Sequence, residues 1–296
     1  MKKAVQFIIL TCLLSWIAAG TAISLGIRET KTFSYVIFGA CYMLMPMICA
    51  VILQLIHKEK PFRNLNISFR FNRWFIIAGI VPVIAAFMAL GISLFFPGVS
   101  FSSSFEGVLQ QVPDDQKEQA MEQLLKFPPV IFLLISVLQA LAAGYTINAV
   151  FAFGEELGWR GYLLKALKGR KLLHISFITG IVWGLWHFPL ILIGHNYPQH
   201  PIHGVGMMVI LCILLAPVMT YIVIKSKSVI TAAIYHGTIN AIAGISVLYL
   251  VGGNDLTNGL TGFAGFIALI IITLAFYLFD KFITKENIFT RITGDN

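Results

Sequence analysis

The chain has 296 residues, of which 58% are hydrophobic and only 11% are charged, and its mean hydropathy is +0.84. Because a soluble domain carries about a quarter charged residues, this composition excludes an ordinary soluble protein and indicates an integral membrane protein. The net charge of +8 is typical of some nucleic-acid-binding proteins, but the basic residues cluster between apolar segments, as at membrane flanks, so we expect no nucleic-acid partner.

Eight apolar segments are each long enough to cross a bilayer, since about 20 helical residues span ~30 Å of hydrocarbon. In chain order they are residues 4–27, 33–56, 74–96, 130–153, 174–193, 205–224, 229–251 and 260–282, and the fourth can extend beyond Phe153. The first has features of a cleaved signal peptide, but its apolar length favours a membrane span. We therefore expect an all-α bundle of about eight transmembrane helices, forming a single domain over residues 1–296.

Basic residues fall mainly in the segments that are cytoplasmic if the N-terminus lies inside. Of the 21 Lys and Arg residues, 17 lie in those segments and four lie in the others, namely Arg28, Lys31, Lys117 and Lys126. The positive-inside rule therefore predicts that both termini are cytoplasmic. We expect a multi-pass protein of a cell membrane, and the short loops and Met-Lys-Lys start favour a bacterial plasma membrane.

Two of the predicted outer loops have polar patterns. In the longest, Asp114–Lys126 has helix-forming composition with apolar residues at i, i+3 and i+4, which predicts a short amphipathic helix on the outer surface. The other contains His195, His200 and His203, but neither a carboxylate nor a cysteine lies near them in the sequence. We therefore favour an ordinary turn over a metal site there.

The four cysteines lie inside apolar segments and lack the spacing of metal ligands. They are Cys12, Cys41, Cys49 and Cys212. Cysteine in such surroundings behaves as a small hydrophobic residue, so we expect neither disulfides nor metal binding.

Ionisable residues at membrane depth are costly and by default indicate a functional site. Here such residues, together with one asparagine, form three groups on separate predicted spans: Glu155, Glu156 and Arg160 at the end of the fourth, His187 in the fifth, and His236 with Asn240 in the seventh. Glu156 and Arg160 are four residues apart, so they share a helix face and should form an ion pair that leaves Glu155 available for chemistry. His236 and Asn240 have the same spacing and present one polar face.

Local sequence around His187 predicts a distorted helix. Pro189 removes a backbone hydrogen bond and should kink the helix beside the histidine, while Gly184 leaves room for another group to approach. Counted from a turn at residues 169–171, Glu155 and His187 are both ~20 Å along their helices at ~1.5 Å per residue, so the two can meet. Structural hydrogen bonding between helices and an ion pathway are alternative roles for the three groups, but we favour a reaction centre.

These groups resemble the motifs of the CPBP family of intramembrane proteases, also called the CAAX protease and bacteriocin-processing, or Abi, family. The family pattern is Glu-Glu-x-x-x-Arg, Phe-x-x-x-His and His-x-x-x-Asn, in this order on separate transmembrane helices. Trp183 stands where the family usually has Phe, and we expect altered wall packing with catalysis retained. The direct resemblance covers residues 153–240, within a motif-bearing core of about 128–251.

The resemblance implies peptide hydrolysis inside the membrane. It assigns Glu155 as the general base that deprotonates a water, with His187 holding that water or sharing the proton transfer. His236 and Asn240 are assigned as donors to the oxyanion, and Glu156 with Arg160 positions the helix.

Metal dependence is left open by the sequence. A zinc ion held by Glu155, His187 and His236 is possible, but a His-Glu-x-x-His helix is missing, so we favour a mechanism without a cofactor.

The predicted function is an intramembrane endopeptidase acting on a membrane-associated or lipidated peptide or protein, surrounded by lipid. A non-catalytic membrane scaffold or regulator, including a bacteriocin-immunity protein of the same fold, is the alternative, and a transporter is less favoured. Eukaryotic family members cleave the last three residues from prenylated CAAX proteins, whereas bacterial relatives are linked to immunity, peptide maturation and regulated proteolysis. The sequence leaves the substrate and the oligomeric state open.

Overall fold

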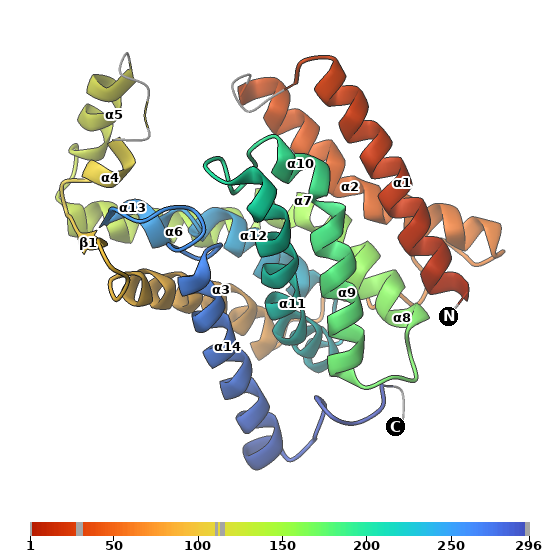
Figure 1. Ribbon diagram of the computed structural model, residues 1–296. Coiled ribbons are helices and arrows are strands. Elements are labelled where there is room, and N and C mark those ends of the chain that lie inside the picture. The colour runs from red at the N-terminus through yellow and green to blue at the C-terminus, as the bar shows by residue number, and fades with distance from the viewer. Residues whose placement is uncertain (1, 28–31, 110–111, 113–115, 294–296) are drawn as a thin grey trace.

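Long apolar helices make up most of the chain (Figure 1). The computed structural model of the protein describes residues 2–27, 32–109, 112 and 116–293. Within these ranges, six helical segments are long and apolar enough to cross a membrane: α1 (Lys2–Ser24), α2 (Thr32–Ile56), α3 (Arg73–Ser93), α11 (Pro201–Ser226), α12 (Ile230–Ile242) with α13 (Ile245–Leu248), and α14 (Phe263–Leu278) with the π-helix η3 (Phe279–Thr284). The predicted all-α membrane bundle is therefore confirmed.

The fourth and fifth predicted spans are each broken. The fourth consists of α6 (Pro129–Tyr145) and α7 (Ile147–Glu156), and it continues through the π-helix η2 (Leu157–Leu163) into α8 (Leu164–Ala166). The fifth consists of α9 (Leu172–Trp186) and α10 (Phe188–Leu192). A seventh span is counted only if α6 is joined to the helix before it, Lys117–Leu124, across a bend of 91°. The expected total of eight spans therefore remains a prediction.

Each break in these two spans coincides with a local feature of the sequence. Pro189 is the second residue of α10, and the chain turns at His187 between α9 and α10, as the proline predicts. At the other break, the Thr146 hydroxyl donates to the carbonyl of Ala142 at 2.6 Å, a back-bond that bends helices. The break at Thr146 was not predicted, because a single threonine is common within membrane helices.

The predicted amphipathic helix of the long outer loop is present as α5 (Lys117–Leu124), which has no buried residue. Asp114 and Asp115 lie outside the described residues. The same loop contains α4 (Glu106–Leu109) and β1 (Ser100–Phe101), and β1 pairs antiparallel with β2 (Leu250–Val251), with Ser100 opposite Val251. Figure 1 shows α4 and α5 projecting beyond the helical bundle.

Segments predicted to be cytoplasmic meet at one end of the bundle. Glu59 accepts hydrogen bonds from Lys165, at 2.7 Å, and from Lys3. These bonds lower the pKa of Glu59 to about 2, so the junction stays charged even in mild acid. The amide of Gly169 also donates to the carbonyl of Thr293 at 3.0 Å, and both termini lie on this side of the bundle in Figure 1. Which side of the membrane this end occupies remains a prediction, and Arg28 and Lys31 lie outside the described residues.

Close contact between α9 and α11 depends on two glycines of α9. A Cβ atom at Gly184 would lie 2.4 Å from the Cα of Val209, and one at Gly180 would lie 2.5 Å from the Cα of Ile213. Small residues four apart allow such approach of membrane helices. The space predicted at Gly184 is thus filled by the α11 backbone, and this contact fixes α9, the helix that ends next to His187.

Candidate active site

The two adjacent glutamates end α7 and are buried. Glu155 is 2% exposed and Glu156 is fully buried, as is Arg160 in the following π-helix at 1%. Arg160 Nη1 lies 3.0 Å from Glu156 Oε2 and donates to Oε1 at 3.1 Å, which is the ion pair that their spacing predicts. Short π-helical segments occur frequently at functional sites, and this one immediately follows the two carboxylates.

Glu156 also binds His236 on α12. Their Nδ1 and Oε1 atoms are 2.9 Å apart, and His236 is 6% exposed. Since an ionised carboxylate accepts only, the Nδ1 atom of His236 must carry a proton that it donates. Glu156 therefore links Arg160 to a predicted catalytic histidine, a role that the sequence analysis did not assign to it.

Trp183 on α9 makes the direct contact with Glu155. Its indole Nε1 donates to Glu155 Oε2 at 2.8 Å. The guanidinium of Arg160 lies 4.4 Å from the Trp183 ring centroid, and the His236 ring lies edge-on to the indole at 5.3 Å. The structure thus places Trp183 among the charged groups, and a phenylalanine at this position could not donate to the carboxylate. This role was missed in the sequence, where the tryptophan was noted only as a change in wall packing.

His187 lies one turn beyond Trp183, at the break between α9 and α10. Its Nδ1 atom is 2.8 Å from the backbone carbonyl of Trp183. A carbonyl cannot donate, so Nδ1 carries the proton, and in the neutral ring Nε2 is left as an acceptor. The ring packs at 4.8 Å against Trp186, and the residue is 7% exposed.

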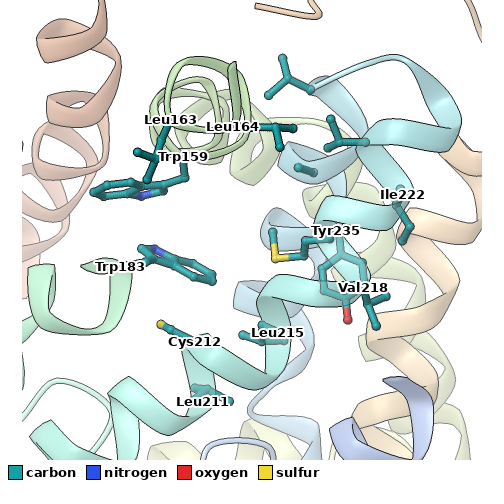
Figure 2. Close-up of a cluster of buried hydrophobic side chains, with 14 of the residues drawn as sticks. Trp159, Leu163, Leu164, Trp183, Leu211, Cys212, Leu215, Val218, Ile222 and Tyr235 are labelled. Carbon is teal, nitrogen blue, oxygen red and sulfur yellow. The ribbon is translucent and has the colours of Figure 1, made fainter. Parts of the chain in front are cut away.

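Hydrogen bonds with residues of α1 and α2 support the break beside His187. Tyr42 donates to the carbonyl of Trp186 at 2.8 Å, and the Trp186 indole donates to Ser15 Oγ at 2.7 Å. Buried hydrophobic side chains from η2, α9, α11 and α12 form one cluster beside these groups, with Trp159 and Trp183 on one side of Cys212 (Figure 2). Such surroundings exclude water and strengthen the electrostatic contacts of the polar groups.

Asn240 differs from the other predicted site residues because it is exposed. Within the described part of the chain its side chain makes no hydrogen bond, although it lies one turn after His236 on α12. The structure therefore brings Glu155, Glu156, Arg160 and both histidines together around Trp183, and leaves Asn240 at the surface beside them.

The residues proposed for zinc do not form a metal site in this arrangement. Among the described residues, no three His, Cys, Asp or Glu side chains lie close enough to share an ion. Glu155, His187 and His236 instead each have a protein hydrogen-bond partner.

Two of the three histidines of the outer loop have partners from elsewhere in the chain. His200 Nδ1 lies 2.6 Å from Asp255 Oδ1, and His195 Nδ1 lies 3.0 Å from the hydroxyl of Tyr35. A carboxylate is therefore near this loop after all, supplied by the segment before α14. The His200–Asp255 contact joins two loops, and the favoured reading as a turn is consistent with it.

Two comparisons with known proteins match the part of the chain that contains these residues. A family model described as type II CAAX prenyl endopeptidase Rce1-like matches residues 128–242, which include every predicted site residue. CAAX prenyl protease 2 of Methanococcus maripaludis is 31% identical over 237 residues, which are 78% of this chain and 80% of that protein.

Proposed function

Because the chain belongs to the Rce1-like type II CAAX prenyl endopeptidase family and is thus an intramembrane protease, we propose that Glu155 activates the water that cleaves its substrate. The observation that carries this proposal is the hydrogen bond from Trp183 to a buried carboxylate at 2.8 Å. This bond holds Oε2 and leaves Oε1 to accept a proton. A base fixed in this way requires little rearrangement before the reaction.

In the proposed reaction, a water hydrogen-bonded to Glu155 and to His187 Nε2 loses a proton to Glu155 as its oxygen attacks the substrate carbonyl. The tetrahedral intermediate then collapses, the C–N bond breaks, and the same proton passes to the leaving amine. The carbonyl of Trp183 supports His187 in this role because it fixes the tautomer whose Nε2 can accept.

We propose that His236 stabilises the oxyanion as an imidazolium. Its Nδ1–H is directed at Glu156, so Nε2 can donate to an oxyanion only when the ring carries a second proton. The Glu156 carboxylate accepts from Nδ1–H and so holds the ring in one orientation. Asn240, exposed one turn along the same helix, supplies a second donor to the carbonyl of a bound substrate.

We propose that the substrate is a membrane-anchored or lipidated polypeptide and that no metal takes part in the reaction. The exposure of Asn240 supports access to this site from the molecular surface, and the relative's name describes an activity on prenylated proteins. On the sequence features described above, we place the protein in a bacterial plasma membrane.

The test is a cleavage assay with the full chain in liposomes. Three peptides are compared by mass spectrometry: a farnesylated CAAX peptide, the same peptide without the lipid, and a peptide with one membrane-spanning segment. We expect cleavage of a membrane-bound peptide, unchanged by a zinc chelator. Loss of cleavage with the chelator and recovery with zinc would contradict the metal-free mechanism. Flux of an uncleaved solute across the liposome membrane would favour a transporter.

A further inference from the structure

A basic pocket that includes none of the catalytic groups lies where the start of α3 meets the end of α11. It has a volume of about 630 Å³, and its lining includes Arg70, Arg73, Lys225 and Lys227. Among the described residues that line it there is no carboxylate. Four cations around one cavity repel one another, so an anion in the cavity would be strongly attracted.

Hydrogen bonds between two chain segments build the frame of the basic pocket. Ser228 Oγ donates to the carbonyl of Ser68 at 2.5 Å, and the amide of Val229 donates to the carbonyl of Asn66 at 2.7 Å. Asn72, which caps α3, donates to the carbonyl of Ser226 at 3.2 Å. The loop before α3 is thereby attached to the turn after α11, so the basic side chains project from a fixed backbone.

The cations of the basic pocket are only partly neutralised by protein groups. Trp74 is 5% exposed, and its ring centroid lies 5.6 Å from both Arg73 Cζ and Lys225 Nζ. Lys225 also forms an ion pair with Glu286. Within the described part of the chain, Arg70, Arg73 and Lys227 have no carboxylate partner, so three cations are available to a ligand.

Two aromatic residues place the basic pocket at the membrane interface. Phe69 is 83% exposed and Phe71 is 68% exposed, and they flank Arg70 in the sequence. Both α3 and α11 are long enough to span the membrane, so their joined ends lie near the headgroups. Aromatic side chains at this level insert among lipids, and a basic side chain between them reaches the phosphate layer. A free phosphate ion would make no use of the two phenylalanines.

We propose that the basic pocket binds the headgroup of an anionic phospholipid such as phosphatidylglycerol, whose acyl chains lie against Phe69 and Phe71. The site is separate from the peptidase site and includes none of its residues. The positive-inside count predicts that the pocket lies in the cytoplasmic leaflet, where basic pockets between membrane helices attract anionic lipids.

The test is native mass spectrometry of the full chain in detergent, titrated with phosphatidylglycerol, with phosphatidylcholine, or with phosphatidylglycerol in the presence of inorganic phosphate. The test variant is Arg70→Gln with Lys227→Gln. The matched control is Lys60→Gln with Arg63→Gln. It also removes one lysine and one arginine charge, but from the exposed part of the loop before α3. Thermal unfolding checks that each variant is folded. If the double variant Arg70→Gln with Lys227→Gln does not fold, Arg70→Gln alone replaces it.

We expect the wild type to bind one phosphatidylglycerol at least tenfold more tightly than phosphatidylcholine. The pocket variant should raise the Kd for phosphatidylglycerol about 25-fold, at about a fivefold loss per charge, and Arg70→Gln alone about fivefold. The control variant should change it less than threefold. Equal losses in the pocket and control variants would overturn the proposal, because the effect would then be one of net charge. Equal affinity for the two lipids, or displacement of phosphatidylglycerol by millimolar phosphate, would also overturn it.

Discussion

The indole of Trp183 donates a hydrogen bond to Glu155 across 2.8 Å and so joins α9 to the end of α7. The same residue accepts a hydrogen bond from His187 through its backbone carbonyl, also at 2.8 Å. One tryptophan therefore orients both groups that we propose to act on the water. A base and its partner held by a shared residue keep their relative position even though they belong to different helices.

Removing the indole N–H should weaken catalysis without unfolding the protein. We expect Trp183→Phe to lower kcat about tenfold with little change in KM, because the lost bond holds a charged carboxylate and is worth more than about 1 kcal/mol. Trp159→Phe is the matched control: its indole is equally buried, and its Nε1 has no hydrogen-bond partner among the described residues. Steady-state kinetics of both variants measure the difference, and equal losses would show that ring volume alone matters.

Glu156 has two partners, and their contributions can be separated. Glu156→Gln alone should destabilise the fold by about 3–5 kcal/mol, since it leaves the buried Arg160 charge uncompensated. Adding Arg160→Met should restore most of the stability, while kcat should remain at least tenfold low because His236 lacks its anion. Thermal unfolding and kcat are measured on both variants. Recovery of kcat together with stability would show that Glu156 serves only the ion pair.

Asn240 should affect turnover far more than stability. We expect Asn240→Ala to lower kcat by about 10²–10³-fold, as when one oxyanion donor is removed. Its effect on stability should be below about 0.5 kcal/mol, because the side chain is exposed. Asn148→Ala is the control, since that side chain donates to the carbonyl of Gly237 at 3.1 Å and should affect stability instead. Normal turnover by folded Asn240→Ala would remove Asn240 from the mechanism.

Gly184 should be intolerant of a side chain. Gly184→Ala places a Cβ atom 2.4 Å from the backbone of Val209, so α9 and α11 must separate, and we expect a loss of about 1–3 kcal/mol. Gly206→Ala on α11 is the comparison, because nothing lies within 4 Å of a Cβ atom there. Thermal unfolding in one detergent should rank the two variants in this order, and equal stability would contradict the close contact.

The sequence predicted those structural features that depend on residues close to one another in the chain. Apolar length identified six of the eight predicted membrane spans, the four-residue spacing predicted the ion pair of Glu156 with Arg160, and Pro189 predicted the break beside His187. Each of these depends on residues within one or two turns of each other. The order of the three motifs also identified the family by resemblance.

Contacts between separate helices could not be predicted in the same way. Trp183 meets Glu155, and His236 meets Glu156, because of how α7, α9 and α12 are rotated and shifted against one another. A count of residues from a shared turn predicted that Glu155 and His187 reach similar depths. The residue that contacts Glu155 is instead Trp183, one helical turn before His187. An error of one turn exceeds the reach of a hydrogen bond, so the pairing within the site required the structure.

The most direct test of the proposed mechanism is single-turnover cleavage by Glu155→Gln in liposomes. Glutamine keeps the size of the side chain and an oxygen that accepts from Trp183, but it cannot take a proton from water. We predict that the variant folds, binds the membrane peptide with unchanged affinity, and cleaves it about 10²–10⁴-fold more slowly than the wild type. Glu118→Gln, on the exposed helix α5, should cleave normally. Cleavage by Glu155→Gln at the wild-type rate would contradict the role of Glu155 as the base.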